Sequence, residues 1–296
     1  MSQDPAPTTN PPSLTQLRAL FRQHGFHPRR SLGQTFLIDG NIVRNIVAAA
    51  DLTGDESVLE LGAGAGAVTS ELAHAARRVV AVELDSTLVA ILHEVVGGAA
   101  EIVQADMLSL DWADLFGPAD RGRWRVVANL PYAITGPALF RLAEVRQWAS
   151  RLVIMVQEEV GERLVASPGG RARGILSVLL QALFDITIVA RVSQTCFYPR
   201  PKVGSMILVM DVRSPAVLSP ALEPAFRRVV RAAFGTRRKT LANALAAAPE
   251  LAISKADAIA ALSQSAIDPR RRAESLSEEE FLRLAEAISG PREGCA

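Results

Sequence analysis

Hydrophobic and polar positions along this chain follow two different patterns. Between residues 57 and 212, short apolar runs rich in valine, isoleucine and leucine alternate with stretches in which apolar residues recur every three or four positions. The runs predict buried strands and the stretches predict helices, a combination typical of a parallel sheet covered on both faces. Seven strands are predicted, at residues 57–62, 78–85, 100–106, 125–130, 151–157, 186–192 and 205–212.

The last two of these strands are joined differently from the others. Their connection, residues 193–204, contains no helical pattern. A parallel pair needs a crossover, usually a helix, whereas an antiparallel pair does not. We therefore expect an antiparallel pair at the edge of the sheet.

Helical patterns occupy both ends of the chain. Residues 13–25 predict a helix capped by Ser13 and ended by Gly25, and Asp39 can cap a second helix over residues 41–52. Beyond about residue 213 only helical periodicity is found, in four segments at 223–235, 237–247, 253–265 and 277–289. Ser277 and Glu280 form a capping box for the last of these helices.

These patterns predict the domain organisation. We expect a disordered tail at residues 1–15, an α/β domain at residues 16–214 and a small all-helical domain at residues 215–296. The length of 296 residues and the hydrophobic content of 49% allow one large and one small domain.

Charge and cysteine content limit the cellular compartments and the binding partners that the sequence allows. The 32 Lys and Arg nearly balance the 31 Asp and Glu, so any nucleic-acid surface has to be a local patch. The two cysteines, Cys196 and Cys295, form no CxxC pair, which suits a reducing compartment. The N-terminal residues have no apolar signal core, and no apolar run reaches membrane-spanning length. The sequence predicts a soluble, cytoplasmic protein.

Several kinds of catalytic site are missing from the sequence. The four histidines and two cysteines show no metal-ligand spacing, so no metal site is predicted. There is no G-x-S-x-G elbow and no Walker loop. These absences argue against most classes of hydrolase and nucleoside triphosphatase as the function of this chain.

A glycine-rich loop follows the first strand of the predicted sheet. Gly62, Gly64 and Gly66 allow a ligand to approach the backbone closely, and they precede a helix whose N–H groups are free. Gly62, Gly64 and Ala67 also satisfy the dinucleotide pattern G-x-G-x-x-G/A. Glu83, at the end of the next strand, suits a ribose in either case. The loop alone therefore leaves a dinucleotide and S-adenosylmethionine open.

Acidic residues beside the loop favour the second cofactor. Glu60, Glu83, Asp106 and Asn129 lie at or beside the ends of successive predicted strands. Carboxylates near a pyrophosphate would repel it, whereas they suit the sulfonium and ammonium groups of S-adenosylmethionine. Asp106 by itself is more simply explained as a turn cap. In series with the other residues, it predicts an S-adenosylmethionine site.

The tetrapeptide Asn129-Leu130-Pro131-Tyr132 suggests what receives the methyl group. An adenine amino group is a weak nucleophile because its lone pair is delocalised into the ring. Acceptors aimed at its two N–H bonds favour the pyramidal geometry needed for attack and stabilise the developing positive charge. The Asn129 side chain and the Leu130 carbonyl can be these acceptors, and Tyr132 can stack on the base. By itself, the tetrapeptide is equally compatible with a simple turn and a packed tyrosine.

The motifs GAGAG, VELD, QAD and NLPY, in this order, resemble the ribosomal RNA adenine N6-dimethyltransferase family. SLGQTFL resembles its N-terminal Gln-Asn-Phe-Leu motif, and FYPRPKVGS its F-x-P-x-P-K-V-x-S segment. AFGTRRKTLANAL and IDPRRRAESLS resemble its C-terminal signatures, and they favour the small-subunit (kasugamycin-resistance) branch over the macrolide-resistance methylases of the large subunit. The resemblance extends from about Arg29 to Phe281.

The resemblance implies a doubly wound, seven-stranded Rossmann-like methyltransferase sheet with a small helical C-terminal domain. It also implies a monomer that uses S-adenosylmethionine to dimethylate N6 of two adjacent adenines near the 3′ end of small-subunit rRNA, in an immature subunit. The cofactor residues are then expected to be Thr35, Leu37, Gly62, Gly64, Glu83, Asp106 and Asn129. The target-base pocket is expected to contain Asn129, Leu130, Pro131, Tyr132 and Phe197.

This chain departs from the family pattern at two positions. Thr35 stands where the family usually has Asn, so its contact with the cofactor depends on whether the shorter hydroxyl side chain reaches it. Ala133 replaces a frequent Asn. Phe197 can alternatively be a core residue of an edge strand.

Basic residues predict where RNA binds. Six basic residues and no acidic one lie between Arg227 and Lys239. Such a cluster can neutralise phosphates, although a solvated helix face is an alternative explanation. The expected RNA contacts are Arg29, Arg30, Lys202, Arg237, Arg238 and Lys239. Sequence reasoning leaves open two other functions, a DNA adenine methyltransferase and a non-enzymatic subunit-assembly factor.

Overall fold

The computed structural model describes residues 12–29, 33–117, 122–214, 216–236 and 238–290. The chain forms two compact units. The first unit comprises Met1–Gly161 and Ile186–Val212, and the second comprises Glu162–Asp185 and Arg213–Ala296. Of the tail expected at residues 1–15, residues 1–11 lie outside the described part of the chain.

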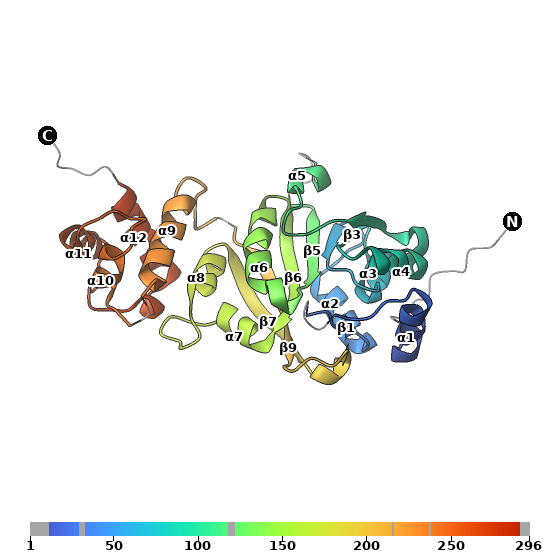
Figure 1. The fold of residues 1–296 in the computed structure, drawn as a ribbon. Coiled ribbons are helices and arrows are strands. Elements are labelled where there is room, and N and C mark those ends of the chain that lie inside the picture. Colours follow the sequence, from blue (N-terminus) through green and yellow to red (C-terminus); the bar gives the residue numbers. More distant parts are fainter. Residues whose placement is uncertain (1–11, 30–32, 118–121, 215, 237, 291–296) are drawn as a thin grey trace. The chain divides into compact units, whose positions relative to one another are not determined.

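A seven-stranded mixed sheet forms the centre of the first unit (Figure 1). Its order is β4-β3-β2-β5-β6-β9-β7. Strands β2 to β6 pair in parallel, and β9 pairs antiparallel with β6. All seven predicted strands are confirmed, as β2 (Ser57–Leu61), β3 (Arg78–Glu83), β4 (Glu101–Gln104), β5 (Trp124–Asn129), β6 (Ala149–Gln157), β7 (Phe184–Val192) and β9 (Ser205–Val212).

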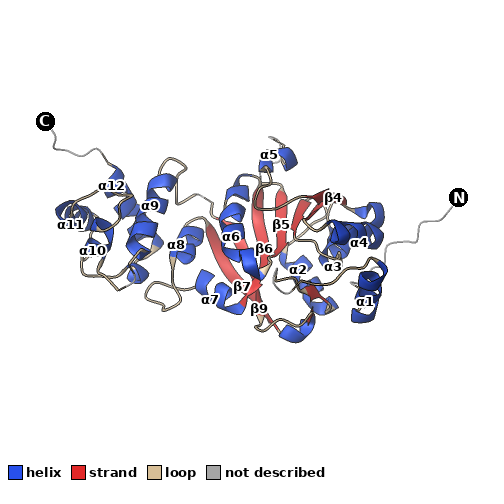
Figure 2. Ribbon diagram, viewed as in Figure 1, coloured by secondary structure: helices blue, strands red, loops and turns tan. Residues whose placement is uncertain are grey.

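The sheet carries helices on both faces (Figure 2). On one face, Val43 of α2 (Gly40–Ala49) and Leu72 of α3 (Ala67–Ala75) share a core with Val58 of β2. Leu92 of α4 (Ser86–Val96) belongs to another core cluster, with Ala81 of β3. Every residue of β2 is buried, which is the burial expected of a central parallel strand. The remaining helices of this region are α5 (Trp112–Leu115), α6 (Thr135–Leu142) and α7 (Glu158–Leu164).

Capping residues fix the helix starts that the sequence predicts. Ser13 and Gln16 form a capping box at α1 (Leu14–Gln23), and the Asp39 carboxylate accepts from the Asn41 N–H at the start of α2. These hydrogen bonds satisfy N–H groups that have no partner within the helix. The predicted starts of both helices are confirmed.

A second, two-stranded sheet was not predicted. β1 (Phe36–Leu37) pairs antiparallel with β8 (Phe197–Tyr198), and the Ile38 N–H donates to the Cys196 carbonyl at 2.9 Å. Strands of two residues are too short to show alternation in the sequence. This ladder joins the N-terminal motif SLGQTFL to the later motif FYPRPKVGS.

The second unit is helical, with α8 (Ile175–Gln181), α9 (Glu223–Phe234), α10 (Leu241–Ala246), α11 (Lys255–Gln264) and α12 (Glu278–Ser289). The four C-terminal helical segments and the Ser277–Glu280 capping box of α12 are confirmed. Residues Glu162–Asp185 group with these helices, whereas the sequence placed them with the sheet.

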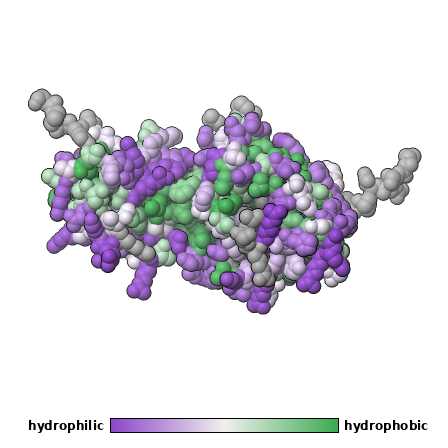
Figure 3. Space-filling model, viewed as in Figure 1, coloured by the Kyte–Doolittle hydropathy of each residue, from purple (hydrophilic) through white to green (hydrophobic). Residues whose placement is uncertain are grey.

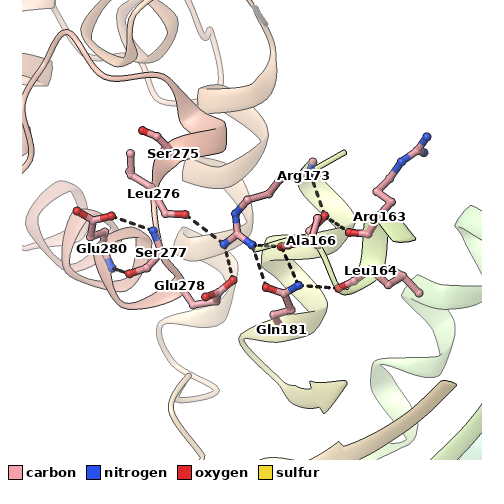
Figure 4. Close-up of polar contacts among 12 residues, drawn as sticks. Arg163, Leu164, Ala166, Arg173, Gln181, Ser275, Leu276, Ser277, Glu278 and Glu280 are labelled. Atoms are coloured by element: carbon pink, nitrogen blue, oxygen red, sulfur yellow. Dashed lines mark hydrogen bonds and ion pairs between the residues drawn. The ribbon is translucent and has the colours of Figure 1, made fainter. Parts of the chain in front are cut away.

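The buried Arg173 explains this grouping (Figure 4). Its side chain donates to the Ala166 carbonyl at 2.7 Å and to the Leu276 carbonyl at 3.1 Å, and it forms an ion pair with Glu278. The residue is 2% exposed, so these contacts neutralise a guanidinium that water does not reach, and they engage its two terminal nitrogens. They tie the loop before α8 to the start of α12.

Hydrophilic residues are interspersed with smaller hydrophobic areas on the face drawn in Figure 3. Among the described residues, no helix is both long enough and apolar enough to cross a membrane.

Candidate active site

A cavity of about 540 Å³ lies at the carboxyl ends of β2, β3, β4 and β5 in the first unit. In open parallel sheets, ligands bind outside these ends, where the strand order reverses. Leu17 of α1 and residues of the segment 33–37 also line it. The cavity brings together most of the predicted site residues, namely Arg29, Thr35, Leu37, Gly62, Gly64, Glu83, Asp106, Asn129, Leu130 and Pro131.

The glycine loop touches the end of β5. Gly62 has φ +74°, and a Cβ at this position would lie 3.2 Å from the Asn129 carbonyl oxygen. Only glycine adopts this conformation without strain and tolerates so close an approach. The loop and the Asn129 turn are therefore one packed assembly.

Glu83 shapes the loop as well as lining the cavity. One carboxylate oxygen accepts from the Gly64 N–H at 2.8 Å. The other accepts from the Leu84 N–H at 2.8 Å and from the Asp85 N–H at 3.0 Å. Backbone hydrogen bonds of this kind stabilise and orient a carboxylate. The negative charge of Glu83 is therefore held in place before any ligand arrives.

Glu60 is a buried acid near the end of β2, two residues before Gly62 of the glycine loop. It is 3% exposed, and its Oε2 has no hydrogen-bond partner within the described part of the chain. Burial raises the pKa of this carboxyl to about 8, and the nearby Glu83 charge adds to the effect. Glu60 is therefore mainly protonated at neutral pH, and a cation in the cavity would favour its ionised form.

Asp106 caps a turn and also lies at the cavity. Its Oδ1 accepts from the Leu108 N–H at 2.9 Å, which caps the turn after β4. The residue also lines the cavity. Turn capping and a cavity position are thus compatible at this residue.

Several apolar residues that line the cavity were not predicted from the sequence, and two of them, Leu84 and Met107, directly follow predicted acidic residues. Leu84 lines the cavity although it is 61% exposed, and Met107 lines it as well. Leu84 directly follows the strand-end Glu83, and Met107 directly follows Asp106. An apolar side chain after a strand-end acid is the signal that could have identified them, because both offer surface to a flat ring.

These features test whether S-adenosylmethionine fits. The cavity combines a buried acid with an unpartnered oxygen, three further acidic residues (Glu83, Asp85 and Asp106), a backbone loop and apolar walls. A cationic sulfonium and ammonium group match the acids, and an adenine ring matches the apolar walls. The residues present fit this cofactor.

The turn after β5 presents free hydrogen-bond acceptors. The Leu130 N–H donates to the Met155 carbonyl at 3.1 Å, and the Pro131 carbonyl accepts from the Ile134 N–H at 3.1 Å. Across the described residues, no hydrogen bond engages the Asn129 side-chain amide or the Leu130 carbonyl. Both residues line the cavity, and Leu130 is 1% exposed.

Tyr132 is held at its hydroxyl, which lies 2.7 Å from the Ser205 hydroxyl. Burial raises the pKa of the Tyr132 phenol, and hydrogen bonds with Ser205 and Thr35 partly offset this. Tyr132 is thus a neutral phenol at physiological pH. Thr35, expected at the cofactor, lines the cavity and also contacts Tyr132.

Phe197 lies in the core. It is 3% exposed and packs in a cluster with Leu37 and Val43 rather than lining the cavity. This position agrees with the alternative considered from the sequence, a core residue beside the edge of the sheet. Stacking on a base would require the ring to become uncovered.

The predicted basic residues are divided between the two units. Arg29 and Lys202 are exposed in the first unit, and Arg29 also lines the cavity. Arg238 and Lys239 are exposed in the second unit. Arg30 and Arg237 lie outside the described residues.

Residues 25–289 match the family model described as ribosomal RNA adenine dimethylase. A ribosomal RNA small subunit methyltransferase A from Moorella thermoacetica is 44% identical, covering 91% of this chain and 96% of that protein. The protein of the same name from Geobacter metallireducens is 43% identical, covering 90% and 98%.

Two solved structures share the fold. A dimethyladenosine transferase from Plasmodium falciparum superposes with a TM-score of 0.71 at 25% identity, covering 84% of this chain and 95% of that one. The 23S rRNA methyltransferase ErmE superposes with a TM-score of 0.66 at 27% identity, covering 86% and 99%.

Proposed function

This chain belongs to the ribosomal RNA adenine dimethylase family, and from that premise we propose that it dimethylates N6 of two adjacent adenines in the 3′-terminal hairpin of small-subunit rRNA. The small subunit is favoured because relatives at 43% and 44% identity carry that substrate in their name. The observation that carries the proposal is the acid-lined cavity that ends at the unengaged acceptors of Asn129 and Leu130.

The cofactor would be held by the residues around the cavity. S-adenosylmethionine, when bound, supplies a methyl group that is already activated by the sulfonium leaving group. Glu60 and Glu83 balance its positive charges, and Asp106 can accept from its adenine amino group. Leu84 and Met107 exclude water from its ring.

The turn after β5 would hold the target adenine. The Asn129 Oδ1 and the Leu130 carbonyl accept from the two N–H bonds of the amine, which favours its pyramidal form and stabilises the positive charge that forms on nitrogen. Pro131 fixes the direction of the Leu130 carbonyl. Tyr132 stacks on the base that carries the amine.

RNA phosphates would be bound by exposed basic residues of both units. Arg29, which lines the cavity, and Lys202 act from the first unit, and Arg238 and Lys239 act from the second unit, with Arg30 and Arg237 beside them in sequence. An immature small subunit as the partner, a monomeric state and a cytoplasmic location belong to this proposal.

A methylation assay tests the proposed substrate. Small subunits that lack the modification are incubated with the protein and S-adenosylmethionine, and the 3′ hairpin is probed by primer extension. Stops at two adjacent adenines are expected, with none on duplex DNA offered as a competitor. Methylation of the DNA, or an unmodified hairpin, would contradict the proposal.

A further inference from the structure

Ser205 is a buried residue whose hydroxyl meets the hydroxyl of Tyr132. It begins β9, is 1% exposed, and its Oγ lies 2.7 Å from the Tyr132 hydroxyl. A buried hydroxyl needs a partner, and Tyr132 supplies one. The contact joins the turn after β5 to β9, although β6 lies between these strands in the sheet.

The backbone around Ser205 is closely packed. Ser205 pairs with Gln157 in the β6–β9 ladder, and the Gly204 carbonyl accepts from the Glu158 N–H at 3.0 Å. A Cβ at Gly204 would lie 3.1 Å from a Glu158 carboxylate oxygen and 3.3 Å from the Val192 carbonyl oxygen. The Ser205 hydroxyl is therefore presented from a fixed point of the sheet.

The backbone of Tyr132 is packed against Gly33. A Cβ at Gly33 would lie 3.0 Å from the Tyr132 backbone nitrogen, so the N-terminal segment packs directly against this residue. A packed backbone alone still permits several side-chain rotamers. A hydrogen bond at the far end of the ring selects one of them.

We propose that Ser205 is a positioning residue that holds the Tyr132 ring in the orientation required for stacking on the target adenine. The inference rests on the proposed function, because ring orientation affects turnover only when a base stacks on the ring. Small misplacements of a positioned substrate lower rates strongly.

Kinetics of four variants separate positioning from a purely structural role. Ser205→Ala is expected to lower kcat about tenfold while the cofactor Kd is unchanged, because Ser205 does not line the cavity. Tyr132→Phe is expected to show a similar loss, since it removes the same hydrogen bond. The double variant should be no worse than either single variant, because the two changes remove one interaction.

Ser177→Ala is the matched control. Ser177 is 0% exposed and its hydroxyl donates to the Arg163 carbonyl at 2.6 Å in the second unit. This variant loses that buried hydrogen bond and also the one that the hydroxyl accepts from the Gly174 N–H at 3.0 Å, so it should lose stability with full kcat. Full kcat in Ser205→Ala, or losses that multiply in the double variant, would overturn the proposal.

Nuclear magnetic resonance provides a readout that does not depend on activity. The chain has two tyrosines, so a tyrosine-labelled sample gives two sets of signals, and Tyr198→Phe assigns them. The Tyr132 side chain should have a high order parameter that falls in Ser205→Ala but not in Ser177→Ala. If the wild-type protein methylated no rRNA, the proposed function would fail, while this order parameter would still decide whether Ser205 fixes the ring. An unchanged order parameter in Ser205→Ala would refute the inference.

Discussion

Asn129 is the residue on which the chemistry of the proposed site depends. Its side-chain amide is unengaged within the described structure, and its backbone packs against Gly62 of the glycine loop. The acceptor acts mainly as positive charge develops on the amine, so its removal should affect turnover more than cofactor affinity.

Asn129→Ala is expected to lower kcat on small subunits by about 100-fold, with a smaller change in the cofactor Kd. Isothermal titration and single-turnover methylation measure the two effects. Asn45→Ala, at an exposed position of α2, is the control and should behave as wild type. An unchanged rate in Asn129→Ala would refute the acceptor role.

Glu60 makes stability depend on pH in a predictable direction. Its pKa is about 8 in the folded protein against an ordinary value of 4.5, so the folded state keeps a proton that the unfolded state releases. Stability is therefore lost as pH rises above about 4.5, until the carboxyl is ionised in both states above about 8.

Glu60→Gln should remove this dependence. Between pH 5 and 9 the variant is expected to gain up to about 4 kcal/mol in unfolding free energy relative to wild type, because the amide never ionises. Urea unfolding across this range measures the difference. Parallel stability curves for the two proteins would show that Glu60 does not titrate as described.

At the scale of elements, residues 33–37 and the turn after β5 pack against each other. β1 pairs with β8, and a Cβ at Gly33 would lie 3.0 Å from the Tyr132 backbone nitrogen, a contact that requires the neighbouring backbone to shift. Residues 33–37 of the first motif thus contact both the NLPY turn and the FYPRPKVGS segment, which are distant in sequence.

Gly33→Ala tests this contact, and Gly25→Ala controls for backbone strain. Both glycines have positive φ, at +69° and +63°, but a Cβ at Gly25 meets nothing within 4 Å. Both variants should lose about 1 kcal/mol of stability from the strained conformation. Only Gly33→Ala is expected also to lower kcat, by displacing Tyr132. Equal kinetics in the two variants would contradict the contact.

The elements also show what sequence could predict. The seven strands and the caps Ser13, Asp39 and Ser277 carry strong local signals, and the structure confirms them. β1 and β8 were missed because two residues show no periodicity, and their pairing depends on contacts distant in the chain. The core position of Phe197 likewise depends on tertiary packing that a motif does not encode.

At the scale of the whole molecule, the boundary between the two units differs from the one that the hydrophobic pattern predicts. Sequence placed the boundary near residue 214, where strands give way to helices. Residues 162–185 instead belong with the C-terminal helices, because Arg173 is buried among their carbonyls and Glu278. Such a boundary is set by a contact between residues about one hundred positions apart, which periodicity does not report.

Arg173→Met is expected to destabilise the second unit by about 3–5 kcal/mol, because it leaves the buried Glu278 without its partner. Cofactor binding, which belongs to the first unit, should persist. Arg270→Met, which removes an exposed pair with Asp268, is the control and should show no measurable change. Thermal unfolding of both variants, followed by helical circular dichroism, makes the comparison. Equal stability of the two variants would show that the contact of Arg173 with Glu278 does not stabilise the second unit.

The most direct test of the account is mass mapping of modified nucleosides after incubation of unmethylated small subunits with the protein and labelled S-adenosylmethionine. We expect two adjacent N6,N6-dimethyladenosines in the 3′-terminal hairpin with the wild-type protein, and almost none with Asn129→Ala. Label at other positions, label in the large subunit, or equal modification by the Asn129→Ala protein would contradict it.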